Sequence, residues 1–147
     1  MQFFMTKKLI ALAADHAGYP MKEMVKDYLA GKGYDILDLG TDSTASVDYP
    51  DYGHAMGEAM DSGRAARGIV ICGSGIGISM AANRHASVRA ALCTNSLMAR
   101  LARQHNDANV LALGARIVGD EVAKNCVDEF LSTKFEGGRH QRRVEKL

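Results

Sequence analysis

Short apolar runs alternate with amphipathic segments along most of this 147-residue chain. The apolar runs lack the apolar–polar alternation of a half-exposed sheet, so we expect strands that are buried on both faces. Strands are predicted over Leu9–Ala14, Tyr34–Leu39, Gly68–Cys72, Val88–Leu92 and Val110–Leu113. Helices are predicted over Pro20–Ala30, Asp51–Ser62, Gly77–Asn83, Ser96–Gln104 and Asp120–Thr133.

This order of elements indicates an α/β fold. Strands that alternate with helices imply a parallel sheet covered on both sides. We therefore predict a three-layer α/β/α sandwich, Rossmann-like, with a five-stranded parallel sheet. The length suits a single domain over residues 1–147. The tail from Phe135 breaks at Gly137–Gly138, and we predict a C-terminal basic arm or short helix after it.

Residue types at three predicted helix ends agree with this pattern. Pro20 suits the first turn of a helix, Gly31 suits a C-terminal stop, and Asn95 suits an N-cap.

The composition and charge of the chain mainly exclude classes of protein. With a net charge of +1, the protein has no large overall charge that would attract it to nucleic acid or to a membrane. Cys72, Cys93 and Cys126 form no CxxC pair and are odd in number, which disfavours a disulfide framework or a zinc site. The apolar run after Lys7 and Lys8 is too short for a signal-peptide core, and no segment approaches membrane-spanning length. We expect a cytoplasmic protein.

Polar residues follow several of the predicted strands. Asp15 and His16 come after the first strand, Cys72 ends the third, and Arg116 lies just past the fifth. In an open parallel sheet, ligands bind outside the carboxyl ends of the strands. We therefore expect these four residues to share one edge of the sheet.

The stretch ICGSGIG at 71–77 joins a predicted strand to a predicted helix. It is not the GxGxxG dinucleotide fingerprint, because Ile78 stands where the last glycine would be, and it lacks the GK[ST] of a P-loop. Its backbone N–H groups suit an anion site, but a tight turn with glycines placed for close packing explains the loop equally well. Cys72 favours the first interpretation, because a helix N-terminus favours the thiolate form of a neighbouring cysteine.

Several motifs together resemble the type B ribose-5-phosphate isomerases, a family that includes galactose-6-phosphate isomerase subunits. They are DHAG at 15–18, DYPDY at 48–52, CGSGIGISMAANR at 72–84, RQHNDANVLALGAR at 103–116 and GGRHQRRV at 137–144. The resemblance spans almost the whole chain. It implies a metal-independent aldose–ketose isomerase of the pentose phosphate pathway, with no cofactor, that interconverts ribose 5-phosphate and ribulose 5-phosphate through a cis-enediolate.

The resemblance also implies catalytic roles. Cys72 would move the proton between C1 and C2, and Ser74 would help move the hydroxyl proton. His105 would open the sugar ring, with Asn106 nearby. Some relatives use a glutamate of the glycine loop as the base, but this loop has no carboxylate, so the cysteine version applies. The loop amides implied to stabilise the enediolate run from Gly73 through Gly75 and Ile76 to Gly77.

Substrate-binding roles follow from the same resemblance. Asp15 would bind sugar hydroxyls and Tyr49 would line the site. The implied phosphate ligands are His16, Arg116, Arg139 and Arg143.

The position of His105 raises a geometric problem. Its predicted helix runs back from the edge that carries Cys72, and roughly ten residues at about 1.5 Å each span most of the depth of the sheet. Arg139 and Arg143 follow another helix that also ends away from this edge. We therefore predict a homodimer with shared active sites, in which the partner chain supplies these side chains. A tetramer built from two such dimers is an alternative that the sequence leaves open.

Three other functions remain open from the sequence. A four- or six-carbon sugar phosphate is an alternative substrate, because residues 41–47 and 84–87 cannot be sized from sequence. The second alternative is a sugar-phosphate-binding module without catalysis. Cys72 and His105 count against it, because a passive binder needs neither residue. Nucleic-acid binding by the basic tail ranks last, because the tail lacks interleaved aromatic residues.

Overall fold

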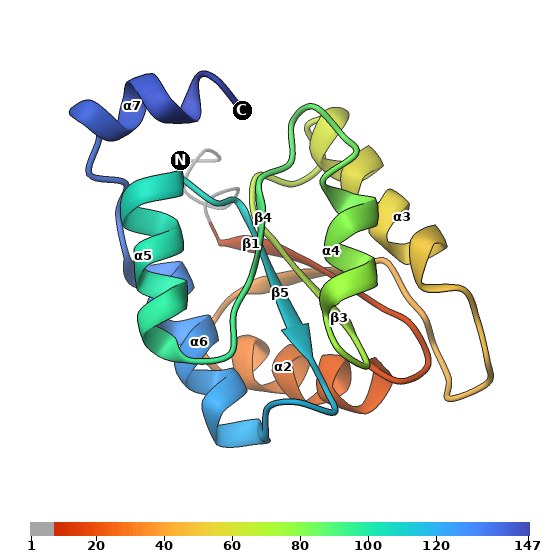
Figure 1. The fold of residues 1–147 in the computed structure, drawn as a ribbon. Coiled ribbons are helices and arrows are strands. Elements are labelled where there is room, and N and C mark those ends of the chain that lie inside the picture. The colour runs from red at the N-terminus through yellow and green to blue at the C-terminus, as the bar shows by residue number, and fades with distance from the viewer. Residues whose placement is uncertain (1–7) are drawn as a thin grey trace.

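The computed structural model describes residues 8–147, which form a twisted sheet with helices on both faces (Figure 1). Residues 1–7 of the predicted domain lie outside the described part. None of the helices within residues 8–147 has the length and hydropathy of a membrane-spanning segment.

All five strands are parallel, in the order β2-β1-β3-β5-β4. The strands are β1 (Leu9–Ala14), β2 (Asp35–Asp38), β3 (Gly68–Cys72), β4 (Ala90–Leu92) and β5 (Val110–Gly114). The helices are α2 (Tyr19–Gly31), α3 (Tyr49–Asp61), α4 (Ile76–Ala82), α5 (Ser96–Asn106), α6 (Asp120–Ser132) and α7 (Arg139–Val144).

Successive side chains of the central strands enter two separate cores, because a strand points its residues alternately to the two faces of a sheet. Leu12 and Ile71 pack in the core beneath α2, α5 and α6. Ala13 and Val70 pack in the core beneath α3 and α4. Figure 1 shows these two groups of helices on opposite sides of the sheet, which confirms the predicted three-layer sandwich.

The expectation that all strands are buried on both faces is wrong for β2 and only partly met in β4. In β2 the terminal residues Asp35 and Asp38 are exposed and the middle two are half-buried, and β4 is half-buried throughout. Both strands lie at an edge of the sheet and have a strand neighbour on one side only. The strands β1, β3 and β5 between them are buried, apart from half-buried Leu9 at the start of β1.

Two element boundaries differ from the prediction in a way that affects candidate residues. Helix α3 begins two residues earlier than predicted, so that Tyr49 lies in its first turn. Helix α5 continues two residues further and ends where Asp107 adopts a left-handed conformation with φ 47°. His105 and Asn106 therefore belong to the last turn of α5 rather than to the loop after it.

The predicted helix ends are confirmed at Pro20 and Asn95. Pro20 lies at the start of α2, and the Asn95 side chain accepts a hydrogen bond of 2.9 Å from the Met98 N–H. Gly31 is still helical, and the left-handed glycine after α2 is Gly33, with φ 89°.

The C-terminal tail is the short helix α7. Gly137 and Gly138 precede it with φ values of 69° and 55°, a region that glycine enters without the penalty a side chain brings. The two glycines thus set the direction in which α7 leaves the preceding segment.

Candidate active site

The strand order creates a switch point between β1 and β3. The chain leaves β1 toward β2 on one side, whereas β3 lies on the other side. Such a divergence at the carboxyl ends of parallel strands is where open α/β sheets bind ligands. A cavity of about 580 Å³ lies there. It is lined by Asp15, His16, Ala17, Tyr49, Cys72, Gly73, Ser74, Ile76, Gly77, Met80, Arg116 and Ile117. The expected convergence of Asp15, His16, Cys72 and Arg116 at one edge is confirmed.

Cys72 is the last residue of β3, and it is only 4 % exposed although its side chain lines the cavity. Its sulfur accepts a hydrogen bond of 3.2 Å from the Gly75 N–H. Gly75 has φ 79°, and a Cβ there would come within 2.6 Å of Leu92 and 2.8 Å of the Leu113 backbone. A glycine is thus required at position 75 for the chain to turn its amide toward the sulfur.

The amides of the glycine loop are not all available to a ligand. The Gly75 N–H is bound to Cys72, and the Ile76 N–H donates to the Ser74 Oγ at 3.2 Å. By contrast, the N–H groups of Gly73, Ser74 and Gly77 donate to no acceptor within the described part of the chain. Gly75 does not line the cavity, so its place is beneath the sulfur rather than against a substrate.

Asp15 and His16 are both held by backbone N–H groups. Asp15 is 6 % exposed, and its Oδ1 accepts from the Gly18 N–H at 3.0 Å. The Nδ1 of His16 accepts from the Val47 N–H at 3.1 Å. In its neutral form His16 therefore carries its proton on Nε2, which leaves one N–H donor for a ligand.

Tyr49 and Arg116 pack directly on glycines of the loop. A Cβ at Gly77 would overlap the Tyr49 ring, and one at Gly73 would lie 3.2 Å from an Arg116 guanidinium nitrogen. The Arg116 N–H also donates to the Gly73 carbonyl at 2.9 Å. The absence of side chains at Gly73 and Gly77 thus lets an aromatic ring and a cation approach the loop.

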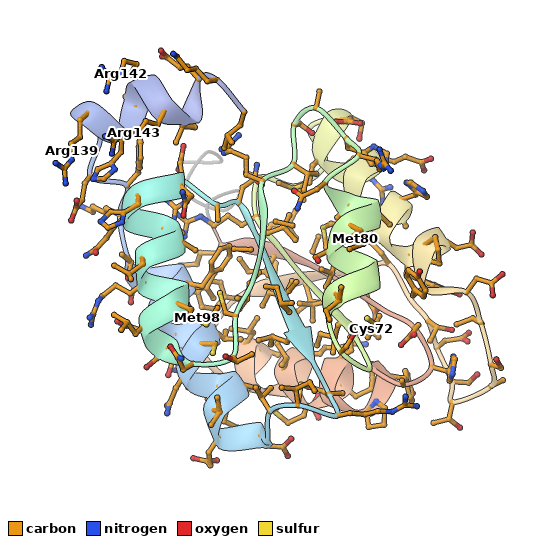
Figure 2. All side chains as sticks on the ribbon, viewed as in Figure 1. Cys72, Met80, Met98, Arg139, Arg142 and Arg143 are labelled. Atoms are coloured by element: carbon orange, nitrogen blue, oxygen red, sulfur yellow. The ribbon has the colours of Figure 1, made fainter. Side chains whose placement is uncertain are left out.

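The remaining candidate residues lie elsewhere. His105, Asn106 and Arg143 line a separate cavity of about 290 Å³ that shares no residue with the cavity at Cys72. Figure 2 shows Arg139 and Arg143 on α7, at the opposite end of the molecule from Cys72. The structure thus divides the predicted site residues into two groups, as the helix-length argument predicts.

His105 is part of a small cluster with Glu136 and His140. The two imidazole rings are stacked, with centroids 4.3 Å apart and planes 12° from parallel. Burial lowers the pKa of His140, and the charges of His105 and Arg139 lower it further. This cluster is the only set of three His, Cys, Asp or Glu side chains in residues 8–147 close enough for one metal ion, with ligand atoms within 4.8 Å of one another. Parallel rings do not aim their nitrogens at one point, so both rings would have to turn before they could bind an ion together.

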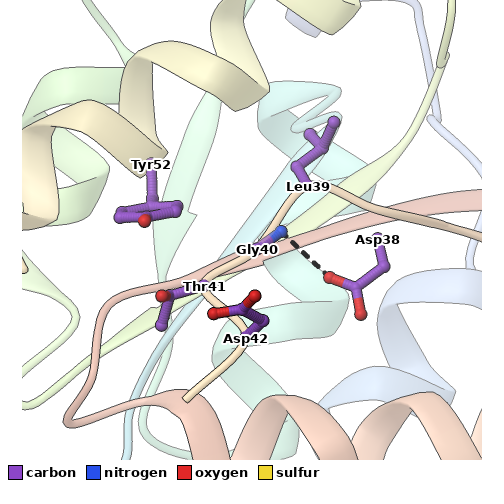
Figure 3. Close-up of a pocket in the computed structure, with 6 residues that line it drawn as sticks. All are labelled: Asp38, Leu39, Gly40, Thr41, Asp42 and Tyr52. Atoms are coloured by element: carbon purple, nitrogen blue, oxygen red, sulfur yellow. Dashed lines mark hydrogen bonds between the residues drawn. The ribbon is translucent and has the colours of Figure 1, made fainter. Parts of the chain in front are cut away.

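A third cavity, of about 510 Å³, lies beside the end of β2 (Figure 3). Asp38 in its wall accepts from the Gly40 N–H at 2.9 Å and from Lys22, whose side chain is 1 % exposed. The carboxylate of Asp38 thus shares the neutralisation of a buried cation with Glu23, which lies 2.8 Å from the Lys22 Nζ, and it anchors the start of the following loop.

Three residues that line the cavity at Cys72 were not among the sequence candidates. Ala17, Met80 and Ile117 each lie close in sequence to a candidate. Met80 follows Gly77 by three residues on α4, so helical spacing from the glycine loop is a signal that would have found it. Ala17 and Ile117 carry no such signal beyond their neighbours His16 and Arg116.

Comparison with known proteins agrees with the sequence motifs. A family model described as Ribose/Galactose Isomerase matches residues 10–147. Ribose-5-phosphate isomerase B of Escherichia coli (strain K12) is 46 % identical over 140 residues, which cover 95 % of this chain and 94 % of that protein.

Solved structures show the same fold. Ribose-5-phosphate isomerase B of Clostridium thermocellum superposes with a TM-score of 0.93 at 53 % identity, covering 94 % of this chain and 93 % of that one. The Mycoplasma genitalium ribose-5-phosphate isomerase B, solved with bound ribulose-5-phosphate, gives a TM-score of 0.88 at 42 % identity, covering 94 % and 92 %.

Proposed function

This chain belongs to the ribose/galactose isomerase family and is therefore an isomerase, and we propose that it interconverts ribose 5-phosphate and ribulose 5-phosphate through a cis-enediolate. The observation that carries the proposal is the Cys72 sulfur at the wall of a cavity, bound to a backbone amide and close to Asp15, His16 and Arg116. The relative from Mycoplasma genitalium, solved with bound ribulose-5-phosphate, supports this substrate.

Cys72 acts as the base in this proposal. Isomerisation removes a proton from the carbon next to the carbonyl and returns it to the adjacent carbon, so one group on one face of the substrate serves both steps. The Gly75 N–H stabilises the thiolate, because a hydrogen bond to a charged acceptor is stronger than one to its neutral form.

The enediolate oxygens are expected to bind the amides that have no protein acceptor. The N–H groups of Gly73 and Ser74 follow Cys72 directly, and donors preorganised in this way stabilise developing negative charge. The Ser74 Oγ accepts from Ile76, so its own proton remains free to move between the two substrate oxygens.

The substrate's other groups would bind around this centre. Asp15 accepts from sugar hydroxyls, whereas the His16 Nε2–H and the exposed Arg116 donate to the phosphate. Tyr49 closes the cavity over Gly77.

We further propose a homodimer in which His105, Asn106, Arg139 and Arg143 of one chain complete the site around Cys72 of the other. One chain alone keeps these groups in separate cavities. Exposed apolar side chains support a partner surface, because contiguous apolar surface on a protein often marks an interaction site. Ile76, Met80 and Ile117 are exposed in the wall of the cavity. Leu97, Met98 and Leu101 are exposed on α5.

An assay with a panel of four- to six-carbon sugar phosphates tests the proposal. We expect the highest kcat/KM for ribose 5-phosphate, unchanged turnover in EDTA, and solvent deuterium at C2 of the aldose. A hydride transfer would instead retain the substrate hydrogen. A higher kcat/KM for a six-carbon phosphate would favour the galactose branch that the family description includes. The cytoplasmic location and the pathway stay predictions from the sequence.

A further inference from the structure

The ring of His140 lies flat against His105, the proposed ring-opening group. The centroids are 4.3 Å apart and the planes differ by 12°. His140 belongs to the first turn of α7, and its N–H donates to the Gly137 carbonyl at 3.0 Å. The side chain of His140 is 12 % exposed, whereas that of His105 is 41 % exposed. His140 is thus the better buried of the two rings, and His105 keeps a large part of its surface exposed.

Glu136 connects the two histidines. Its Oε1 lies 3.8 Å from the His105 Nε2 and 3.6 Å from the His140 Nε2. The Glu136 N–H donates to the Gln104 carbonyl at 3.1 Å, which ties this residue to the last turn of α5. Both Nε2 atoms therefore lie within ion-pair distance of one carboxylate oxygen, but neither is within hydrogen-bond distance of it.

This arrangement restricts a side chain that would otherwise be mobile. The χ2 torsion of histidine has broad minima, so an exposed imidazole at the end of a helix samples many orientations. General acid–base catalysis requires a defined direction of the ring nitrogen toward the substrate oxygen. A stacked ring limits rotation about χ2, and the charge of Glu136 lies on the Nε2 side of the ring.

We propose that His140 is a positioning residue, whose ring holds the His105 imidazole in the orientation that opens the furanose ring of the aldose. The inference rests on the proposed function and on the ring-opening role that the family resemblance implies for His105. His140 itself lies behind His105 in this proposal. Its contribution therefore passes through His105 alone.

The test compares a substrate that forms a furanose ring with one that cannot. Ribose 5-phosphate is mostly cyclic, whereas a four-carbon aldose 4-phosphate has no free hydroxyl with which to close such a ring. In His140→Ala we expect kcat for ribose 5-phosphate to fall about 100-fold, the loss that a small misplacement of a catalytic group causes. The four-carbon substrate should keep its wild-type kcat/KM. His140→Phe, which keeps the stack, should restore most of the loss, and Arg142→Ala is the matched control on the same helix.

An equal loss on both substrates, or a raised KM with unchanged kcat, would show that His140 binds phosphate or merely supports α7, and the proposal would be wrong.

Where the four-carbon phosphate is turned over too slowly, an acyclic phosphorylated hydroxamate that mimics the enediolate replaces it. Its inhibition constant should not change in His140→Ala, and a weaker constant would overturn the proposal. The double variant His105→Ala/His140→Ala should be no slower than His105→Ala, and additive losses would contradict action through His105.

A measurement without substrate separates this inference from the proposed function. Nuclear Overhauser contacts between the two imidazole rings should be present in the wild type and lost in His140→Ala. Contacts without any pentose phosphate turnover would refute the proposed function and, with it, the assigned purpose of the stack. Turnover with no contacts between the rings would refute the positioning role alone.

Discussion

The Gly75 N–H donates to the Cys72 sulfur across 3.2 Å, and this bond joins the last residue of β3 to the turn before α4. It exists because Gly75 adopts φ 79°, which places its amide beneath the strand end. The same turn leaves the Gly73 and Ser74 amides without a partner among the described residues. One backbone conformation thus supplies a donor to the Cys72 sulfur and, in the proposed mechanism, leaves two donors for the enediolate.

Replacement of Cys72 tests the base directly. In Cys72→Ala we expect kcat to fall about 10²- to 10⁴-fold, the usual contribution of a general base. The melting temperature should change little, because the side chain is small and lies at the edge of its core. Stopped assays on ribose 5-phosphate measure the loss.

Cys93 provides the matched control. It is fully enclosed, and burial raises its pKa to about 12, so its thiol stays protonated at neutral pH. Cys93→Ala should therefore keep the wild-type kcat. If Cys72→Ala retained wild-type turnover, the assignment of the base would be wrong.

The conformation of the glycine loop is testable through stability. In Gly75→Ala, a residue with a side chain must adopt the left-handed backbone conformation, which costs about 1–2 kcal/mol of folding free energy. The added Cβ also clashes with Leu92 and the Leu113 backbone. We expect the melting temperature to fall by about 2–8 °C and kcat to fall with it, because the amide leaves the sulfur. Thermal unfolding followed by circular dichroism measures the first effect.

Gly31→Ala serves as the comparison. No atom lies within 4 Å of a Cβ built at Gly31, which is the last residue of α2. Alanine favours a helix over glycine by up to about 1 kcal/mol, so the melting temperature should stay level or rise. Equal losses in the two variants would mean that the left-handed turn is not the cause.

Sequence patterns predicted the elements and the edge of the sheet that carries the first group of site residues. Buried strands such as Gly68–Cys72 have a strong apolar signal, and the glycines mark the turn that follows. The pattern failed at β2, because an edge strand needs fewer apolar residues than a central one and its two aspartates are exposed.

Other features of the site could not be read from the sequence. The order of the strands depends on tertiary packing, so the switch point between β1 and β3 appears only in the structure. The stack of His140 on His105 joins residues 35 positions apart through the turn at Gly137 and Gly138. No periodicity within one element reports such a contact.

The Asp38–Lys22 pair should make stability depend on pH in the acid range. Burial alone would raise the pKa of Asp38, but hydrogen bonds from Lys22, Gly40 and Lys26 outweigh it and leave this pKa below 3.8. The stabilisation is therefore complete well above pH 3.8 and is lost as the pH falls through the folded-state pKa. Urea unfolding as a function of pH measures this loss.

Asp38→Asn should remove part of the acid sensitivity and lower the free energy of unfolding at pH 7 by about 1–3 kcal/mol, because buried Lys22 loses a charged partner. Lys26→Met is the matched control, since Lys26 is 37 % exposed and its pair with Asp38 should contribute less than about 1 kcal/mol. An acid-unfolding profile unchanged in Asp38→Asn would contradict the role of this pair.

Mixed dimers test whether two chains share each active site. Cys72→Ala and His105→Ala chains should each be nearly inactive alone. After subunit exchange, half of the dimers should contain one chain of each kind, and in those one of the two sites has both Cys72 and His105 intact. About one quarter of the wild-type kcat should return, as the two-fold symmetry of a homodimer requires.

The control mixes Cys72→Ala chains with the double variant Cys72→Ala/His105→Ala. No site in that mixture contains a Cys72 thiol, so activity should not return. Mass spectrometry under native conditions confirms that exchange has occurred in both mixtures. Exchange without recovery in the first mixture would show that His105 acts on the Cys72 of its own chain, and that the separate cavities of one chain must then come together by a conformational change.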